Sequence, residues 1–203
     1  MEDQMKFSKD PNLDEPGAGI GVAEMMFLKF YIQPFVMSRL DKIKSLESLS
    51  DGSRRIFDQI KVFKQDELTK RVLVKRPHFV EDSSRYWSAA MLCNHLRKVN
   101  GALAKAIEHS FTAKAGEGYN PVDRLKSVKP DLEKNVVQEI EALQQSIERI
   151  REAVQSQSEL NLNSLQIPHP WFGDLTHLQW VWFAGFHMKV HSRQLRQIYL
   201  GLG

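Results

Sequence analysis

The chain has 203 residues, 42% of them hydrophobic and 26% charged, which are ordinary values for a globular protein that can bury a core without staples. The formal net charge is only +3, from 28 basic and 25 acidic side chains, and no basic run alternates with aromatic residues, so nucleic acid binding is not expected. Cys93 is the only cysteine, which excludes an internal disulfide and a cysteine-rich zinc site.

The N-terminal part is expected to form a polar arm, residues 1–19, followed by a single helical-bundle domain, residues 20–203. The arm lacks the basic-then-apolar pattern of a secretory signal, so we expect a cytoplasmic protein. Residues 20–46 are rich in large apolar side chains but carry several charges, which argues against a membrane span and favours a largely buried helix. Pro34 should kink this helix or begin its second half. The stretch Met25–Met37 carries more apolar surface than an exposed helix tolerates, so we expect a homodimer.

The middle of the chain is less regular. Gly52 marks an expected break, and residues 53–63 are expected to form a shorter helix, followed by a connection over residues 65–84. The next helix is expected to start near Asp82–Ser84, where polar side chains can cap free amides, and to run to about Ser110. Residues 111–130 read as a long loop, which often covers a site or crosses a bundle.

The clearest helical pattern covers residues 131–155. Its apolar side chains recur every three or four residues, at Leu132, Val136, Ile140, Leu143, Ile147, Ile150 and Val154. The last helix is expected to begin at Thr176, because Thr176 and Gln179 fit a capping box and Leu175 and Trp180 fit the matching hydrophobic staple. We find no strand pattern, and we therefore predict an all-α fold of four long antiparallel helices, with additional short helices and an N-terminal extension.

Two histidines of the last helix, His187 and His191, are four residues apart, so their imidazoles lie side by side. Their face also carries aromatic and aliphatic side chains, so both should be buried and should need partners or a shared ion. His95 is expected in mid-helix on another apolar stripe. Three imidazoles from two facing helices predict a metal site with an open fourth position, as in catalytic centres. The alternative is that carbonyls, waters or carboxylates satisfy these histidines without a metal.

Residue 188 is methionine, so the glutamate base of the HExxH metalloprotease pattern is missing and no peptidase is predicted. No carboxylate of the expected core helices stands out as a general base. That absence fits a mechanism in which the metal itself activates the nucleophile.

Two segments, WSAAMLCNHL (87–96) and HPWFGDLTHLQWVWFAGFHMKVHSRQLRQI (169–198), resemble the DinB/YfiT superfamily. The resemblance implies a four-helix bundle in which zinc or nickel is held by one histidine of the second helix and two of the fourth, the positions of His95, His187 and His191. Some members resemble thiol-dependent transferases or isomerases, which implies a low-molecular-weight thiol as a further cofactor. Gln194 matches the family's trailing glutamine; it either orients a ligand histidine or a bound water, or is a helix-surface amide.

The metal interpretation also predicts a pocket, lined by Trp87, Met91, Trp180 and Phe183, although for each of these residues taken alone a place in the core is the simpler explanation. Cys93 is expected to be a small buried side chain on a different face from His95. The remaining expectations concern polar residues: His169 is structural or at the rim of the site, His78, His109 and His177 are surface or loop residues, and Arg193 and Arg196 either meet an anionic substrate or are solvated helix charges.

Two functions are compatible with this sequence. The first is a metal-dependent enzyme of transferase or hydrolase type that acts on a small molecule, with a thiol as a candidate cofactor. The second is a non-catalytic dimeric helical protein that serves as a metal or ligand sensor or as a scaffold. Three imidazoles suit several divalent metals, so the residues do not select one.

Overall fold

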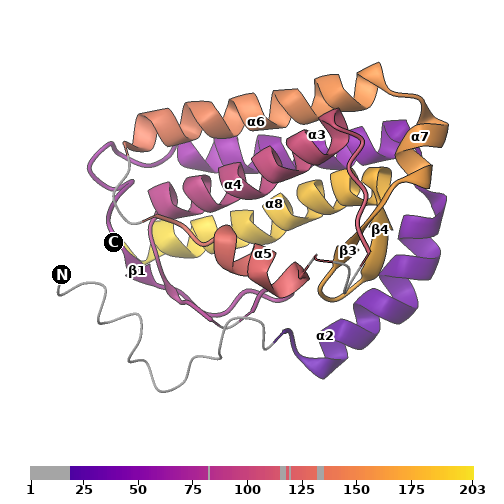
Figure 1. The fold of residues 1–203 in the computed structure, drawn as a ribbon. Helices are drawn as coiled ribbons and strands as arrows, with labels where there is room; N and C mark the ends of the chain where they lie inside the picture. The colour runs from indigo at the N-terminus through magenta and orange to yellow at the C-terminus, as the bar shows by residue number, and fades with distance from the viewer. Residues whose placement is uncertain (1–18, 82, 115–117, 119, 132–134) are drawn as a thin grey trace.

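The computed structural model describes residues 19–81, 83–114, 118, 120–131 and 135–203. Its main elements are four long helices: α3 (Lys42–Ile60), α4 (Ala89–Glu108), α6 (Val136–Ser156) and α8 (His177–Leu200). They lie side by side as a bundle (Figure 1), which confirms the predicted all-α four-helix fold. The predicted arm, residues 1–19, falls outside the described residues except for Gly19. Within the described chain, no helix is both long enough and apolar enough to cross a membrane.

The bundle consists of two parallel helix pairs. Contacts advance together along α3 and α8: Ser48 with Trp182, Asp51 with Lys189, and Phe63 just beyond α3 with Tyr199. They also advance together along α4 and α6: Arg97 with Glu139, and Glu108 with Arg149. Between α4 and α8 they run in opposite directions: His95 with His191, and Phe111 with His177. The two pairs are therefore antiparallel to each other. Since α4 and α6 are parallel, the connection between them must return from the end of α4 to the start of α6. The described part of this crossover contains the short helix α5 (Pro121–Ser127).

The predicted break at Gly52 is wrong, because Gly52 lies inside α3. The absence of a side chain at Gly52 lets α3 pack closely against α8, because a Cβ there would lie 2.4 Å from the carbonyl oxygen of Gly185. A Cβ on Gly185 would in turn lie 2.2 Å from backbone atoms of Ser48. The real break comes earlier, where the Asp41 side chain accepts from the amide of Lys44 and caps the start of α3. The expected separate helix over residues 53–63 is thus the second half of α3.

The predicted single helix over residues 20–46 is interrupted. An α-helical turn, α2 (Val22–Phe27), passes into a π-helical stretch, η1 (Leu28–Val36), and a 3-10 turn, η2 (Met37–Arg39). Pro34 lies inside η1, and a proline lacks the amide hydrogen that a regular helical ladder requires. The inner face packs into an apolar cluster formed by Leu28, Ile32, Met37, Phe172, Leu175 and Phe183. The outer face exposes Val22, Met26, Phe27, Phe30, Tyr31 and Phe35.

Short strands are present, although none was predicted. β1 (Val72–Leu73) pairs with β2 (Tyr86–Trp87), and β3 (Gln166–His169) pairs with β4 (Gly173–Thr176), both antiparallel. The second hairpin turns back at Gly173, whose φ of +73° favours glycine. Strands of two to four residues are too short for an alternating pattern to stand out in a sequence.

Helix starts follow their caps. α4 begins later than the predicted Asp82–Ser84, because Ser88 accepts from the amide of Met91 and caps the helix at Ala89. The predicted capping box of Thr176 and Gln179 is present at the start of α8. In α6, which Asn135 caps, the apolar stripe faces the core from Val136 to Val154; Leu132 lies outside the described residues. A short helix, α7 (Glu159–Ser164), then leads to the second hairpin.

Candidate metal centre

Three histidines converge between α4 and α8. The Nε2 atom of His187 lies 2.9 Å from Nε2 of His191 and 3.4 Å from Nε2 of His95. One nitrogen from each imidazole lies within 4.8 Å of the others. Among the described residues, these form the one group of three or more histidine, cysteine or acidic side chains close enough to share an ion. The spacing of four residues in α8 sets two of them side by side, and the antiparallel α4 supplies the third.

The far side of two of these rings is fixed by hydrogen bonds. Nδ1 of His191 donates to Oε1 of Gln194 at 2.7 Å, and Nδ1 of His95 donates to the carbonyl of Val128 at 2.8 Å. Both partners are acceptors, so the ring proton of each neutral imidazole resides on Nδ1 and the Nε2 lone pair faces the cluster. Nδ1 of His187 is buried and has no hydrogen-bond partner.

Burial keeps all three imidazoles neutral. It lowers the pKa of His191 to about 3, with the nearby His95 acting in the same direction. It lowers the pKa of His187 well below 6.5, and the proximity of His191 and His95 adds to the effect. The pKa of His95 is also lowered by burial, although the Val128 carbonyl opposes the shift. Neutral imidazoles with inward lone pairs are the form that coordinates a metal.

Two of the three nitrogen separations are close to those around a tetrahedrally coordinated ion. Zinc–nitrogen bonds of about 2.0–2.1 Å at tetrahedral angles separate two ligand nitrogens by roughly 3.3 Å. The observed separations of 2.9 and 3.4 Å lie on either side of that value. Nδ1 of His187 points away from these nitrogens, so the three Nε2 atoms are the ones that an ion could bind.

The predicted pocket residues lie at different distances from the cluster. The ring of Trp87 is 5.8 Å from that of His95 and 6.3 Å from that of His191, and Phe183 stacks on His187 at 5.7 Å. Met91 is buried in the core on α4. Trp180 contacts Phe183 and His169. The described contacts therefore place Trp87 and Phe183 at the cluster itself.

The other histidines divide into buried and exposed ones. His169 is buried among aromatic rings, with Phe183 at 4.5 Å, and its Nδ1 accepts from the amide of Trp171. Burial lowers its pKa to about 3. His177, expected at the surface or in a loop, is fully buried at the start of α8, because its Nε2 reaches the carbonyl of Phe111 in the neighbouring connection. His78 and His109 are exposed, as expected.

Three further candidates, Cys93, Arg193 and Arg196, do not belong to the described hydrogen bonds of the three histidines. Cys93 is fully buried, and burial together with the nearby Glu139 raises the pKa of its thiol to about 12, so it stays protonated. Arg193 and Arg196 are exposed. The sequence did not indicate the contact of the Val128 carbonyl with His95, because a backbone carbonyl carries no residue signature.

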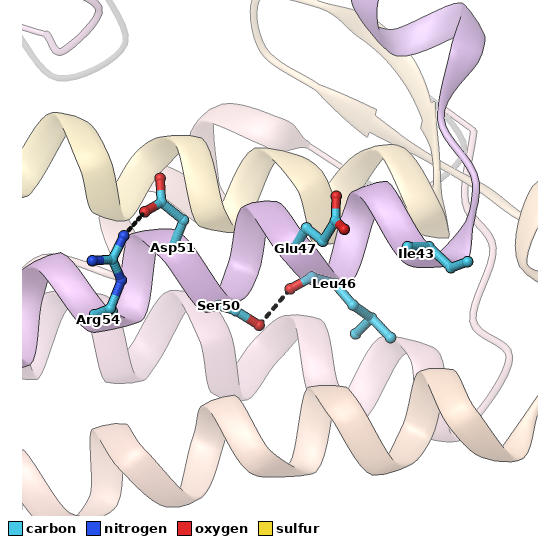
Figure 2. Close-up of a pocket in the computed structure, with 6 residues that line it drawn as sticks. All are labelled: Ile43, Leu46, Glu47, Ser50, Asp51 and Arg54. Carbon is cyan, nitrogen blue, oxygen red and sulfur yellow. Dashed lines mark hydrogen bonds and ion pairs between the residues drawn. The ribbon is translucent and has the colours of Figure 1, made fainter.

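An open surface hollow of about 520 Å³ lies elsewhere, on the outer side of α3. Figure 2 shows its lining: Ile43, Leu46, Glu47, Ser50, Asp51 and Arg54. All six belong to one helix, and the Asp51 carboxylate is already paired with Arg54, Arg55 and Lys189. We therefore regard the histidine cluster, and not this hollow, as the candidate site.

Comparisons with known proteins support the fold. No protein-family model matches the chain, and no curated protein matches its sequence. Among solved structures, the chain is similar to the mycothiol-dependent maleylpyruvate isomerase, with a TM-score of 0.56 and 12% sequence identity. The alignment covers 78% of this chain and 62% of the isomerase chain. At this identity the similarity concerns the fold alone.

Proposed function

We propose that this protein is a DinB/YfiT-like metal-dependent enzyme of transferase or hydrolase type, in which His95, His187 and His191 hold a divalent ion, with zinc or nickel as the best candidates. The observation that carries the proposal is the convergence of three neutral imidazoles, two of them oriented by acceptors behind the ring. The similarity of the fold to an enzyme named as mycothiol-dependent supports a low-molecular-weight thiol as cofactor.

Each residue of the cluster then has a definite task. The three histidines bind the divalent ion, and Gln194 and the Val128 carbonyl orient two of them. Trp87 and Phe183 keep water away from the histidine rings. When bound, a divalent ion with an open coordination position would favour the ionised form of a thiol or a water at neutral pH. No carboxylate belongs to the described cluster, so this task does not rest on a neighbouring side-chain base.

The proposal is tested first by metal analysis of protein purified without a histidine tag. We expect about one divalent ion per chain, the stoichiometry of a three-histidine site. His191→Ala should abolish binding, because it removes a buried ligand. His78→Ala should leave it unchanged, because His78 is exposed and bonded to Glu24. Absence of metal even after reconstitution with zinc and nickel would refute the metal site.

A second function, a dimeric sensor or scaffold, is favoured by the exposed apolar side chains of α2 and η1. We propose that a second copy of this chain covers this face. Lys29 is the main exposed charge there, and a nearly uncharged face suits a symmetric contact, in which every charge approaches its own copy. Screening small thiols with model electrophiles separates the two functions: metal-dependent turnover supports the enzyme, whereas metal binding without turnover favours the sensor.

A further inference from the structure

The end of the crossover between α4 and α6 is fastened to one turn of α4 beside the histidine cluster. The side-chain oxygen of Asn94 accepts from the amide of Asp131 at 3.0 Å. The ammonium of Lys98 donates to the carbonyl of Lys129 at 2.8 Å and pairs with the Asp131 carboxylate at 2.9 Å. Between these two anchors, His95 donates to the carbonyl of Val128. Neighbouring residues of one α4 turn therefore hold residues 128–131.

The orientation of the His95 ring depends on residues 128–131 of the crossover, whereas that of His191 depends on its own helix. The partner of His191 is Gln194, three residues along the same helix. The partner of His95 is a backbone carbonyl 33 residues away in the sequence. A neutral imidazole can carry its proton on either nitrogen, and only an acceptor at Nδ1 reserves Nε2 for a metal. The position of the Val128 carbonyl thus decides whether His95 is ready to coordinate.

We propose that Asn94 and Lys98 are positioning residues of the metal centre, because they hold the Val128 carbonyl against Nδ1 of His95. The inference rests on the proposed metal site. Asn94 is 1% exposed and the Lys98 side chain 20%, so both anchors are largely shielded from water. A mere surface ion pair would stabilise the fold by little and would leave the ring proton of His95 where it is.

The test is Lys98→Met, which keeps the apolar stem and removes the ammonium. Two quantities are measured: zinc affinity, by competition with a chromophoric chelator, and the protonation of the two His95 nitrogens in zinc-free protein, by nitrogen-15 NMR. We expect zinc binding to weaken about ten-fold, as for other groups that orient metal ligands, and the His95 proton to divide between Nδ1 and Nε2. Lys98→Arg, which keeps the positive charge, should show the zinc affinity and the His95 protonation of the unaltered protein. Lys105→Met, which removes an exposed lysine of the same helix, is the matched control and should change neither.

The outcomes separate this inference from the proposed function. Unchanged affinity and an unchanged His95 proton in Lys98→Met would overturn the inference while the metal site stands. Failure of the unaltered protein to bind either zinc or nickel would refute the metal site, and the NMR measurement would still decide whether Lys98 orients His95. If Lys98→Met does not fold, Asn94→Ala is measured in the same way, with the same two results expected.

Discussion

At the scale of single residues, the cluster is organised by where each imidazole keeps its proton. Gln194 and the Val128 carbonyl occupy Nδ1 of two rings, and burial prevents a second proton from binding. His169, outside the cluster, follows the same logic: its Nδ1 accepts from the Trp171 amide, so its proton is on Nε2, and burial keeps it neutral. The protein therefore contains several histidines that acid can charge only at the expense of the fold.

We predict that the metal-free protein loses stability as the pH falls below about 6.5. The pKa of His169 is about 3 in the folded protein and about 6.5 when unfolded, so the unfolded state binds more protons between these values. Stability is therefore complete above pH 6.5 and decreases as the pH falls toward 3. Between pH 7 and 5 this histidine alone should lower the free energy of unfolding by roughly 2 kcal/mol.

Urea unfolding in the presence of a chelator, at pH 7 and pH 5, measures this loss. His169→Asn is the matched variant, because an asparagine oxygen can accept from the Trp171 amide without titrating. It should lose about 2 kcal/mol less than the unaltered protein over the same interval. Equal losses in both proteins would show that His169 is not held neutral.

At the scale of helices, the contact of Gly52 with Gly185 sets the distance between α3 and α8. We predict that Gly185→Ala lowers the free energy of unfolding by about 3 kcal/mol, because the added Cβ meets Ser48 backbone atoms that cannot move without parting the helices. Gly101→Ala in α4 is the control: nothing lies within 4 Å of its Cβ, so it should stabilise by about 0.5–1 kcal/mol. Urea unfolding measures both. Similar effects at the two positions would contradict the close contact.

What the sequence could predict also differs among the elements. Apolar periodicity identified α6, and paired capping residues placed the start of α8, because both signals lie within a few neighbouring residues. The break predicted at Gly52 was wrong because glycine is typical both of helix breaks and of close contacts between helices. Its contact partner, Gly185, is 133 positions away in the sequence. The hairpin strands, the buried position of His177 and the Val128 carbonyl all depend on contacts across the fold. Grouping His95 with His187 and His191 was possible because helical spacing and apolar stripes are local.

At the scale of the whole molecule, the exposed apolar face of α2 and η1 predicts self-association. Phe30, which is 63% exposed, lies in this face, and Phe30→Glu would place a carboxylate opposite its own copy in a symmetric contact. We expect the unaltered protein to sediment as a dimer and Phe30→Glu as a monomer. Leu160→Glu in α7, at a leucine that is 82% exposed, is the control and should remain dimeric. An unaltered protein that is monomeric at every concentration would refute the contact.

The parallel pairing of α3 with α8 has a consequence for the order of assembly. Ser48 and Trp182, which bond across these helices, are 134 residues apart in the chain. Such distant contacts make folding slow, since a long loop must close before burial compensates for the lost entropy. Until α8 docks, the apolar faces of α3 and α4 stay uncovered, a state prone to aggregation. His187 and His191 arrive with α8 whereas His95 does not, so an ion shared by all three would stabilise the closing step of assembly.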